Sequence, residues 1–177
     1  MTFTQRYDSP LGIALLAADE IGLTGLWFEG QNYFSGHLPA EHTEQETSIL
    51  AEAKRWLDIY FAGSQPDFCP PLHPTGSAFR QRVWEMLLQI PYGQTTTYGE
   101  IARQLAKKQG MARVSAQAVG GAVGHNEISV IIPCHRVVGT NGSLTGYAGG
   151  MDRKVKLLEL EHTDMTRLFV PKKSTAP

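Results

Sequence analysis

A run of β-branched residues ends in a short polar motif in the last third of the chain, which reads Ile128-Ser129-Val130-Ile131-Ile132-Pro133-Cys134-His135-Arg136. Residues 128–132 predict a buried strand, because β-branched side chains favour strands. A cysteine at the end of such a strand, beside a histidine and an arginine, lies where positive neighbours could lower the pKa of its thiol. Cys134 is therefore a candidate nucleophile. The alternative is an inert cysteine and a structural His135, since free cysteines are usually buried.

Three helices are predicted between residue 79 and this motif. Residues 79–87 carry apolar side chains at helical spacing and precede Pro91-Tyr92-Gly93, which ends the first helix. Thr97-Tyr98-Gly99-Glu100 is a capping box, in which the threonine hydroxyl accepts the amide three residues on and the glutamate reaches back. The third helix, over about residues 115–123, consists almost wholly of small residues.

The second and third helices with their turn predict a helix-turn-helix, which places a recognition helix in a DNA groove. Reading base edges needs Arg, Lys, Asn or Gln, and only Gln117 qualifies within the small helix. Small side chains permit close approach to the sugar-phosphate backbone. The alternative is that Gly and Ala here serve only tight helix packing, and spacing alone slightly favours that interpretation.

The front of the chain predicts a small antiparallel sheet covered by a helix. Residues 12–18 and 22–28 are apolar runs separated by Asp19-Glu20, typical of paired strands. Residues 47–61 are apolar at three- and four-residue spacing, which predicts an amphipathic helix. Residues 65–74 hold four prolines and predict a stiff linker. We therefore expect an N-terminal domain over 1–74, a C-terminal domain over 75–165 and a tail over 166–177.

Composition and charge narrow the class of protein. The 177 residues are 42% hydrophobic and 19% charged, as in ordinary globular proteins, which excludes disorder and collagen-like structure. Without a membrane span or a secretion signal the expected location is the cytoplasm, where Cys69 and Cys134 are expected as free thiols. The net charge of −1 combines −7 over residues 1–75 with +6 over the remainder. A basic rear part could meet an anionic partner, although this partition could also arise by chance.

The rear part contains a distinctive set of motifs. They are Ile131-Ile132-Pro133-Cys134-His135-Arg136-Val137-Val138, Asn126, Gly146-Tyr147, Gly149-Gly150, Gly76-Ser77-Ala78-Phe79, Arg82-Val83-Trp84, Ile90-Pro91-Tyr92-Gly93 and Thr97-Tyr98, with Glu161 at the end. In these motifs the rear part closely resembles the O6-alkylguanine-DNA alkyltransferases, also called methylated-DNA-protein-cysteine methyltransferases. The front part resembles them more loosely, through Ser9-Pro10-Leu11-Gly12 and Tyr60-Phe61-Ala62-Gly63.

The resemblance implies an α+β fold in which a small N-terminal antiparallel sheet and helix domain, ribonuclease H-like, joins a mostly helical, winged-helix-like DNA-binding domain. It implies direct repair of double-stranded DNA: the protein flips out the damaged guanine and moves its O6-alkyl group, usually methyl, irreversibly onto the cysteine in a single turnover. O4-alkylthymine is a further candidate substrate. No cofactor, no metal and no membrane are implied, and the protein is expected to act as a monomer.

The resemblance also assigns roles to residues. Cys134 is the acceptor, His135 deprotonates it through a water, and Glu161 orients the histidine. Asn126 braces the active-site turn, while Tyr98 assists flipping and protonates the departing guanine. The residues assigned to substrate or DNA are Tyr147, Ala148, Gln117, Arg113, Ala118, Gly120, Gly121 and Arg136.

The chain departs from the family pattern at three positions. Gln117 stands where an arginine commonly fills the gap left by the flipped base, with Arg113 nearby to assist. Glu127 stands where a proline is frequent, and Ala148 where a serine can occur.

Three alternative functions remain open from the residues alone. A non-transferring sensor of alkylated DNA would share the fold, although such proteins lack the cysteine. A winged-helix regulator would use the cysteine for sensing. A cysteine hydrolase would use Cys134 and His135 with turnover.

Overall fold

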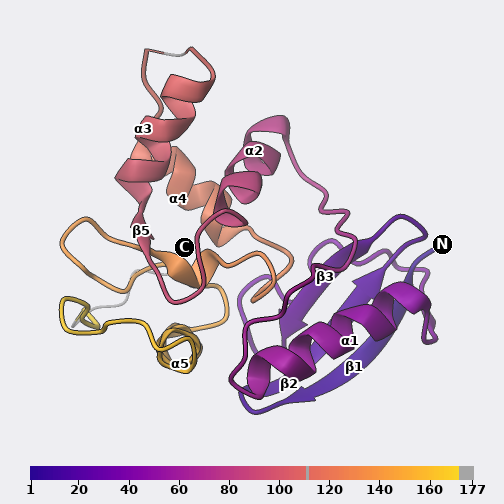
Figure 1. Ribbon diagram of the computed structural model, residues 1–177. Helices are drawn as coiled ribbons and strands as arrows, with labels where there is room; N and C mark the ends of the chain where they lie inside the picture. The colour runs from indigo at the N-terminus through magenta and orange to yellow at the C-terminus, as the bar shows by residue number, and fades with distance from the viewer. Residues whose placement is uncertain (111, 172–177) are drawn as a thin grey trace. The chain divides into compact units, whose positions relative to one another are not determined.

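The computed structural model describes residues 1–110 and 112–171, and the chain divides into two compact units (Figure 1). Unit 1 contains residues 1–75 and 127–131, and unit 2 contains residues 76–126 and the chain from Ile132 onward. The sequence predicted only one crossing between the two parts, within the proline-rich segment. The structure adds a return of the chain to unit 1 immediately before the Pro-Cys-His-Arg motif.

Unit 1 is built on a four-stranded sheet in the order β3-β2-β1-β4. Strands β1, β2 and β3 pair antiparallel, and β4 joins β1 in parallel. The pair predicted at 12–18 and 22–28 is present as β2 and β3. The first strand was missed because only Phe3 and Tyr7 among its seven residues are apolar, so that it contains neither an apolar run nor a clear alternation. The strands are β1 (Phe3–Ser9), β2 (Gly12–Ala18), β3 (Leu23–Phe28) and β4 (Thr43–Glu44).

Helix α1 (Ser48–Phe61) lies along one face of this sheet, as predicted (Figure 1). It begins at Thr47, whose hydroxyl accepts the Leu50 amide at 3.3 Å and so satisfies one free donor of the first turn. It ends before Gly63, which has a φ of +94° that residues with a Cβ rarely adopt. Its buried stripe contributes about 1.5–3 kcal/mol for each large apolar side chain. The stripe consists of Leu50, Ala53, Trp56, Leu57 and Tyr60.

The proline-rich segment is partly a structural element of unit 1. Leu23 donates its amide to the Pro71 carbonyl at 2.8 Å, and His73 donates its amide to the Leu23 carbonyl at 2.7 Å. The end of the predicted linker therefore pairs with β3, and it is not only a spacer.

The strand predicted over residues 128–132 is wrong, although all five residues are buried. The segment pairs with β3 at one position only, where Leu26 donates to Glu127 at 2.8 Å and accepts from Ser129 at 3.1 Å. It then turns, with Val130 at a φ of +69° and the Ile131 amide bound to the Ser129 carbonyl. The apolar, β-branched composition correctly indicated that the segment is buried. The tight turn follows from tertiary contacts, which override the strand propensity of these residues.

Unit 2 is mostly helical. Helices α2 (Ala78–Leu87), α3 (Tyr98–Lys108) and α4 (Ala116–Gly124) match the three predicted helices. Strand β5 (Thr96–Thr97) pairs in parallel with β6 (Val137–Val138), and helix α5 (Met151–Leu160) follows; the sequence analysis did not predict these three elements. The single helical turn Cys134–Arg136 immediately precedes β6.

The start of α3 agrees with the capping box in one of its two bonds. The Thr97 hydroxyl accepts the Glu100 amide at 3.1 Å. The Glu100 carboxylate accepts from Arg103 and Gln104, one turn further along the helix, instead of from the Thr97 amide. The threonine cap alone therefore fixes where α3 begins.

The small residues of α4 serve both of the interpretations left open. Val119, Ala122 and Val123 face inward, and Trp84 of α2 donates its indole N–H to the Ala122 carbonyl at 2.8 Å. The opposite side, which includes Gln117, is exposed. Tight packing thus explains the inner face, and the outer face remains available to a partner.

The predicted tail over 166–177 begins as part of unit 2. Phe169 donates its amide to the Gly142 carbonyl at 3.1 Å and accepts the Leu144 amide at 2.9 Å, while Leu168 packs against Val138 and Leu158. Residues 172–177 lie outside the described residues. Within 1–110 and 112–171, no helix has the length and apolar character needed to cross a membrane.

Candidate active site

The turn that carries Cys134 is held by Asn126, which follows α4. The Asn126 side-chain amide donates to the Ile132 carbonyl at 2.9 Å and to Cys134 Sγ at 3.2 Å. The Cys134 amide closes the turn on the Ile132 carbonyl at 2.8 Å. Asn126 therefore both fixes the backbone of the turn and presents a hydrogen-bond donor to the sulfur.

Cys134 is buried, with 4% of its surface exposed. Burial raises the pKa of its thiol, while the Asn126 hydrogen bond and the charge of Lys154 partly oppose this. The expectation that positive neighbours lower the thiol pKa is therefore not met, because desolvation outweighs them. A thiol of this kind needs a base to take its proton.

His135 and Glu161 form a buried pair next to this cysteine. His135 Nε2 lies 2.7 Å from Glu161 Oε2, and both side chains are fully buried. Burial lowers the pKa of the imidazole despite the carboxylate, so the ring is neutral and its Nε2–H is the donor. Among the described residues Nδ1 has no hydrogen-bond partner. The ring thus offers one free lone pair in a fixed orientation.

Arg136 completes the pair from the other side of the carboxylate. Its Nε and Nη2 donate to the two oxygens of Glu161 at 2.8 and 2.9 Å, and its Nη1 donates to the Ile90 carbonyl at 2.8 Å. Burial alone would raise the pKa of Glu161, but the hydrogen bonds from His135 and Arg136 lower it well below its usual range. The carboxylate therefore stays ionised.

The assignment of Arg136 to DNA or substrate is therefore corrected. Only 8% of the residue is exposed, and its guanidinium fork is taken up by Glu161 and Ile90. A buried carboxylate needs a cation as partner, and Arg136 supplies it. Its effect on Cys134 is indirect, through Glu161 and His135.

Tyr98, the first residue of α3, donates its hydroxyl to the Thr145 carbonyl at 2.9 Å. Burial, the largest cause, and the nearby Cys134 raise the pKa of the phenol to about 12, so it keeps its proton at neutral pH. The ring of Tyr147 meets His135 edge-on, with centroids 6.4 Å apart, and Ala148 is also buried. The loop 143–149 thus lies against both the imidazole and the phenol.

The other predicted DNA-binding residues lie on the outside of α4 and on the turn before it. Arg113, Gln117, Ala118 and Gly121 are exposed, and Gly120 is half-buried. A Cβ at Gly120 would lie 3.8 Å from the Tyr98 ring. Gly120 therefore places the outer side of α4 next to the phenol ring of Tyr98 in the site.

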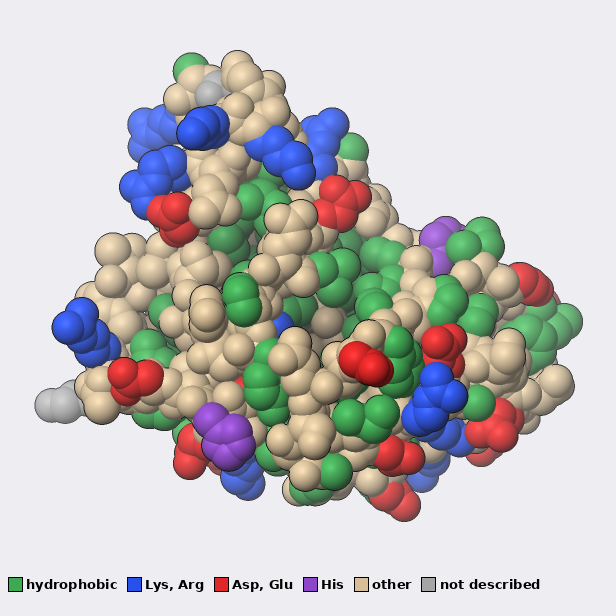
Figure 2. Space-filling model, in the orientation of Figure 1, with side chains coloured by type: hydrophobic (Ala, Val, Ile, Leu, Met, Phe, Trp, Pro, Cys, Tyr) green, Lys and Arg blue, Asp and Glu red, His purple; other side chains and the backbone are tan. Residues whose placement is uncertain are grey.

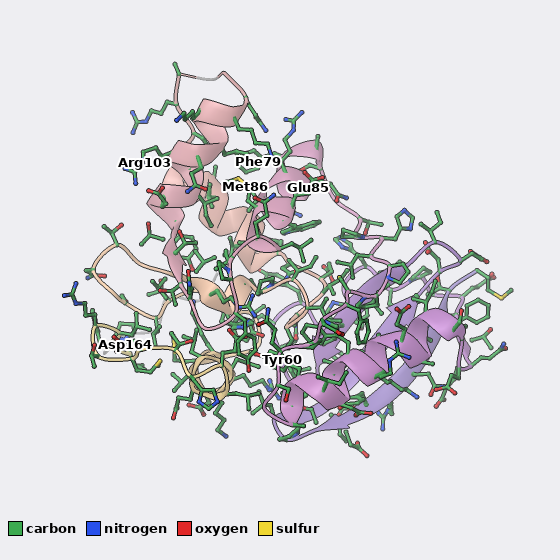
Figure 3. All side chains as sticks on the ribbon, viewed as in Figure 1. Tyr60, Phe79, Glu85, Met86, Arg103 and Asp164 are labelled. Atoms are coloured by element: carbon green, nitrogen blue, oxygen red, sulfur yellow. The ribbon has the colours of Figure 1, made fainter. Side chains whose placement is uncertain are left out.

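Cations accompany this face. Lys and Arg side chains gather around α3 in Figure 2, and Arg103 projects outward from α3 in Figure 3. Arg103, Lys107 and Arg113 line a groove of about 430 Å³ formed by α3 and the residues leading into α4. This arrangement suits a polyanion.

One buried residue of this group, Lys154 of α5, was not predicted from the sequence. Its ammonium group donates to the Val137 carbonyl at 2.6 Å and to the Thr145 carbonyl at 2.8 Å. The sequence did contain a signal for its burial, because Lys154 precedes Leu157 and Leu158 by three and four residues and so shares their face of a helix.

The buried His135 predicts that mild acid destabilises the fold. Below about pH 6.5, the ordinary pKa of histidine, the unfolded chain binds a proton that the folded protein does not. The free energy of unfolding should therefore fall between pH 7 and pH 5, which urea unfolding measures. His135→Gln should lose less over the same interval. An equal loss of unfolding free energy in both proteins would contradict the conclusion that His135 is buried in its neutral form.

The fold and the site together define a class of α+β protein, in which a buried cysteine directly precedes a buried His135–Glu161 pair in a domain that also carries the consecutive helices α3 and α4. Two family models match, described as the ribonuclease-like domain of 6-O-methylguanine DNA methyltransferase over residues 3–74 and its DNA binding domain over residues 78–163. The chain belongs to the 6-O-methylguanine DNA methyltransferase family.

Relatives and solved structures agree with this family. A Mycobacterium leprae protein named methylated-DNA--protein-cysteine methyltransferase is 45% identical over 95% of this chain and 98% of its own. The Mycobacterium tuberculosis O6-methylguanine methyltransferase has a TM-score of 0.76 at 41% identity, covering 98% of this chain and 97% of its own. Mycobacterium tuberculosis OGT in complex with DNA has a TM-score of 0.76 at 43% identity, covering 90% and 92%.

Proposed function

We propose that this protein repairs alkylated DNA directly, by moving the O6-alkyl group of guanine irreversibly onto Cys134. The observation that carries the proposal is a buried cysteine, Cys134, that directly precedes a buried His135–Glu161 pair, in which His135 Nε2 lies 2.7 Å from Glu161 Oε2. The relatives named as methylated-DNA--protein-cysteine methyltransferases support the reaction class.

Transfer begins with the proton of the Cys134 thiol. His135 accepts this proton through a water at its free Nδ1, and the Glu161 carboxylate stabilises the imidazolium that forms. Asn126 donates to the sulfur and supports the thiolate. A thiolate is a soft nucleophile suited to displacement at a methyl carbon.

The departing guanine needs a proton in exchange. The Sγ–carbon bond forms as the carbon–O6 bond breaks, and the electron pair of the carbon–O6 bond stays on the guanine. Tyr98, protonated at neutral pH, donates a proton to the base. The proton lost by the thiol balances the one gained by guanine, so no cofactor is needed. A thioether does not return to a thiolate, and each molecule therefore acts once.

Double-stranded DNA carrying the lesion is the proposed partner, and the exposed face of α4 is the proposed binding surface for it. The cations along the α3 groove suit the phosphate backbone. Gln117 is exposed at the start of α4, where it can fill the space of a flipped base and bond to the orphaned partner. The similar Mycobacterium tuberculosis protein whose structure was solved in complex with DNA supports DNA as the partner.

Intact and peptide mass spectrometry tests the proposal after the protein is mixed with a duplex that holds one O6-methylguanine. One added methyl on the peptide containing Cys134, saturating at one per protein, is expected. Binding of the duplex without an added methyl would overturn transfer and leave a damage sensor. Repeated turnover of an ester or amide would instead indicate a hydrolase.

Tyr98→Phe should slow transfer by removing the proton donor. General acid catalysis contributes roughly 10²- to 10⁴-fold to a rate, so a decrease of about 100-fold in the single-turnover rate is expected. Rapid-quench measurement on the same duplex checks this. Tyr33→Phe, an exposed tyrosine of unit 1, is the matched control. A Tyr98→Phe protein that transfers at the unchanged rate would show that another group supplies the proton.

A further inference from the structure

Lys154 is a buried cation in unit 2 that the mechanism above leaves unused. The residue has 0% of its surface exposed, although it lies on the short helix α5 among charged residues. A lysine is almost never fully buried unless its ammonium group is paired. Its burial therefore needs an explanation in the contacts that it makes.

The contacts of Lys154 join the two backbone segments that form the site. The Val137 carbonyl, 2.6 Å from Nζ, directly follows the turn that carries Cys134 and His135. The Thr145 carbonyl, 2.8 Å from Nζ, belongs to the loop 143–149. One ammonium group thus ties the turn of the nucleophile to the loop that faces it.

The Thr145 carbonyl is also the acceptor for the Tyr98 hydroxyl, at 2.9 Å. One oxygen therefore receives hydrogen bonds from both the lysine and the tyrosine. The direction in which the phenol points depends on where this oxygen lies, and the lysine holds the oxygen in place. Lys154 is in this way linked to Tyr98 without touching it.

The charges around Lys154 come from several elements. Cys134 and His135 both interact with it electrostatically, and Arg136 lies in the same buried group, paired with Glu161. Burial lowers the pKa of the ammonium group to about 8, and Cys134 opposes this. The group therefore still carries its charge at neutral pH. Arg136 is neutralised by Glu161. Lys154, by contrast, binds two backbone carbonyls and no carboxylate within the described residues.

We propose that Lys154 is a positioning residue for alkyl transfer: it fixes the Thr145 carbonyl that orients the Tyr98 hydroxyl, and its charge offsets the negative charge of the Cys134 thiolate. The inference rests on the proposed function. During transfer the negative charge moves from Sγ to the guanine, and the proton from Tyr98 then neutralises it. A fixed cation near the sulfur and the phenol stabilises both ends of this movement without reorganising.

Three variants separate the two parts of this role. Lys154→Met keeps the length and removes both the donor and the charge. Lys154→Gln keeps a donor without charge, and Lys154→Arg keeps the charge. Lys156→Met, an exposed lysine on the same helix, is the matched control. All are made with Cys69→Ser, so that Cys134 is the single thiol, and thermal unfolding and binding to an unmodified duplex are measured for each.

Two readouts are compared with the parent protein. The first is the single-turnover rate of methyl transfer from the duplex, which we expect Lys154→Met to lower by about 10- to 100-fold. The second is the pH at which Cys134 ionises, followed by thiolate absorbance in the ultraviolet, which we expect to rise by about 1 pH unit. Lys154→Arg should recover more of both than Lys154→Gln, and Lys156→Met should match the parent.

The two proposals fail in different ways. If the parent protein transfers no methyl, the proposed function falls, whatever the variants do. If the parent transfers and a folded Lys154→Met equals it in rate and in thiol ionisation, only the role of Lys154 is overturned. If Lys154→Met does not fold, the other two variants decide: a Lys154→Gln protein with the rate and thiol ionisation of the parent overturns the role, and a slower one with a raised ionisation pH supports it.

Lys154→Met and Tyr98→Phe can also be combined. If the lysine acts partly through the tyrosine, the double variant should be less impaired than the product of the two single effects predicts, because residues that act together are not additive. Strict multiplication of the two effects would overturn the link through Thr145.

Discussion

Cys134→Ala should abolish methyl transfer while leaving binding to the duplex largely intact. In the proposed reaction Sγ is the atom that accepts the alkyl group, and alanine removes it. The fold should survive, because Asn126 still donates to the Ile132 carbonyl at 2.9 Å and holds the turn. The residues of α4 that we propose to face DNA lie on a different element and are unchanged.

Mass spectrometry and a gel-shift titration, run on the same preparation and the same O6-methylguanine duplex, check this expectation. Cys69→Ala is the matched control, because Cys69 is the second cysteine of the chain and lies outside the site. The control should take up one methyl like the parent protein. A Cys134→Ala protein that still removes methyl groups from DNA would refute the assigned acceptor.

Glu161→Gln should cost both stability and transfer. The carboxylate is the partner of the buried Arg136 and of His135, at 2.8 and 2.7 Å. Removing one member of a buried ion pair leaves an uncompensated charge, which typically costs about 3–5 kcal/mol. Transfer should slow as well, because the imidazolium formed from His135 loses its stabilising anion.

Urea unfolding at neutral pH and the single-turnover rate measure the two effects of Glu161→Gln. Glu159→Gln, an exposed glutamate two residues earlier, is the control and should change neither. Because interactions in the folded protein lower the pKa of Glu161, its contribution is complete above about pH 4.3, the ordinary pKa, and is lost as pH falls further. The stabilities of parent and variant should therefore converge in stronger acid. A constant difference down to pH 3 would contradict the ion pair.

Local features were readable from the sequence because their causes are local. The start of α3 follows from the Thr97 hydroxyl and an amide three residues on, and the end of α1 follows from Gly63. The family motif around Cys134 likewise placed the candidate nucleophile. The resemblance also paired His135 with Glu161, and the structure places these side chains in contact.

Other features required the tertiary structure. Residues 128–132 have the composition of a strand, yet they turn at Val130, because the chain pairs with β3 at one position and then leaves unit 1. The family resemblance assigned Arg136 to substrate or DNA. Its orientation toward Glu161 follows from the cost of a buried carboxylate without a cation.

The sequence by itself determined helices α1 to α4, the Thr97 cap of α3, the β2–β3 pair and the motif that carries Cys134, because each depends on residues a few positions apart. Only the tertiary structure decided that desolvation raises the thiol pKa, that Arg136 turns inward and that Lys154 joins Val137 to Thr145. These properties depend on burial and on partners distant in the chain. Burial changes the free energy of a charge by more than any neighbour in the sequence can indicate.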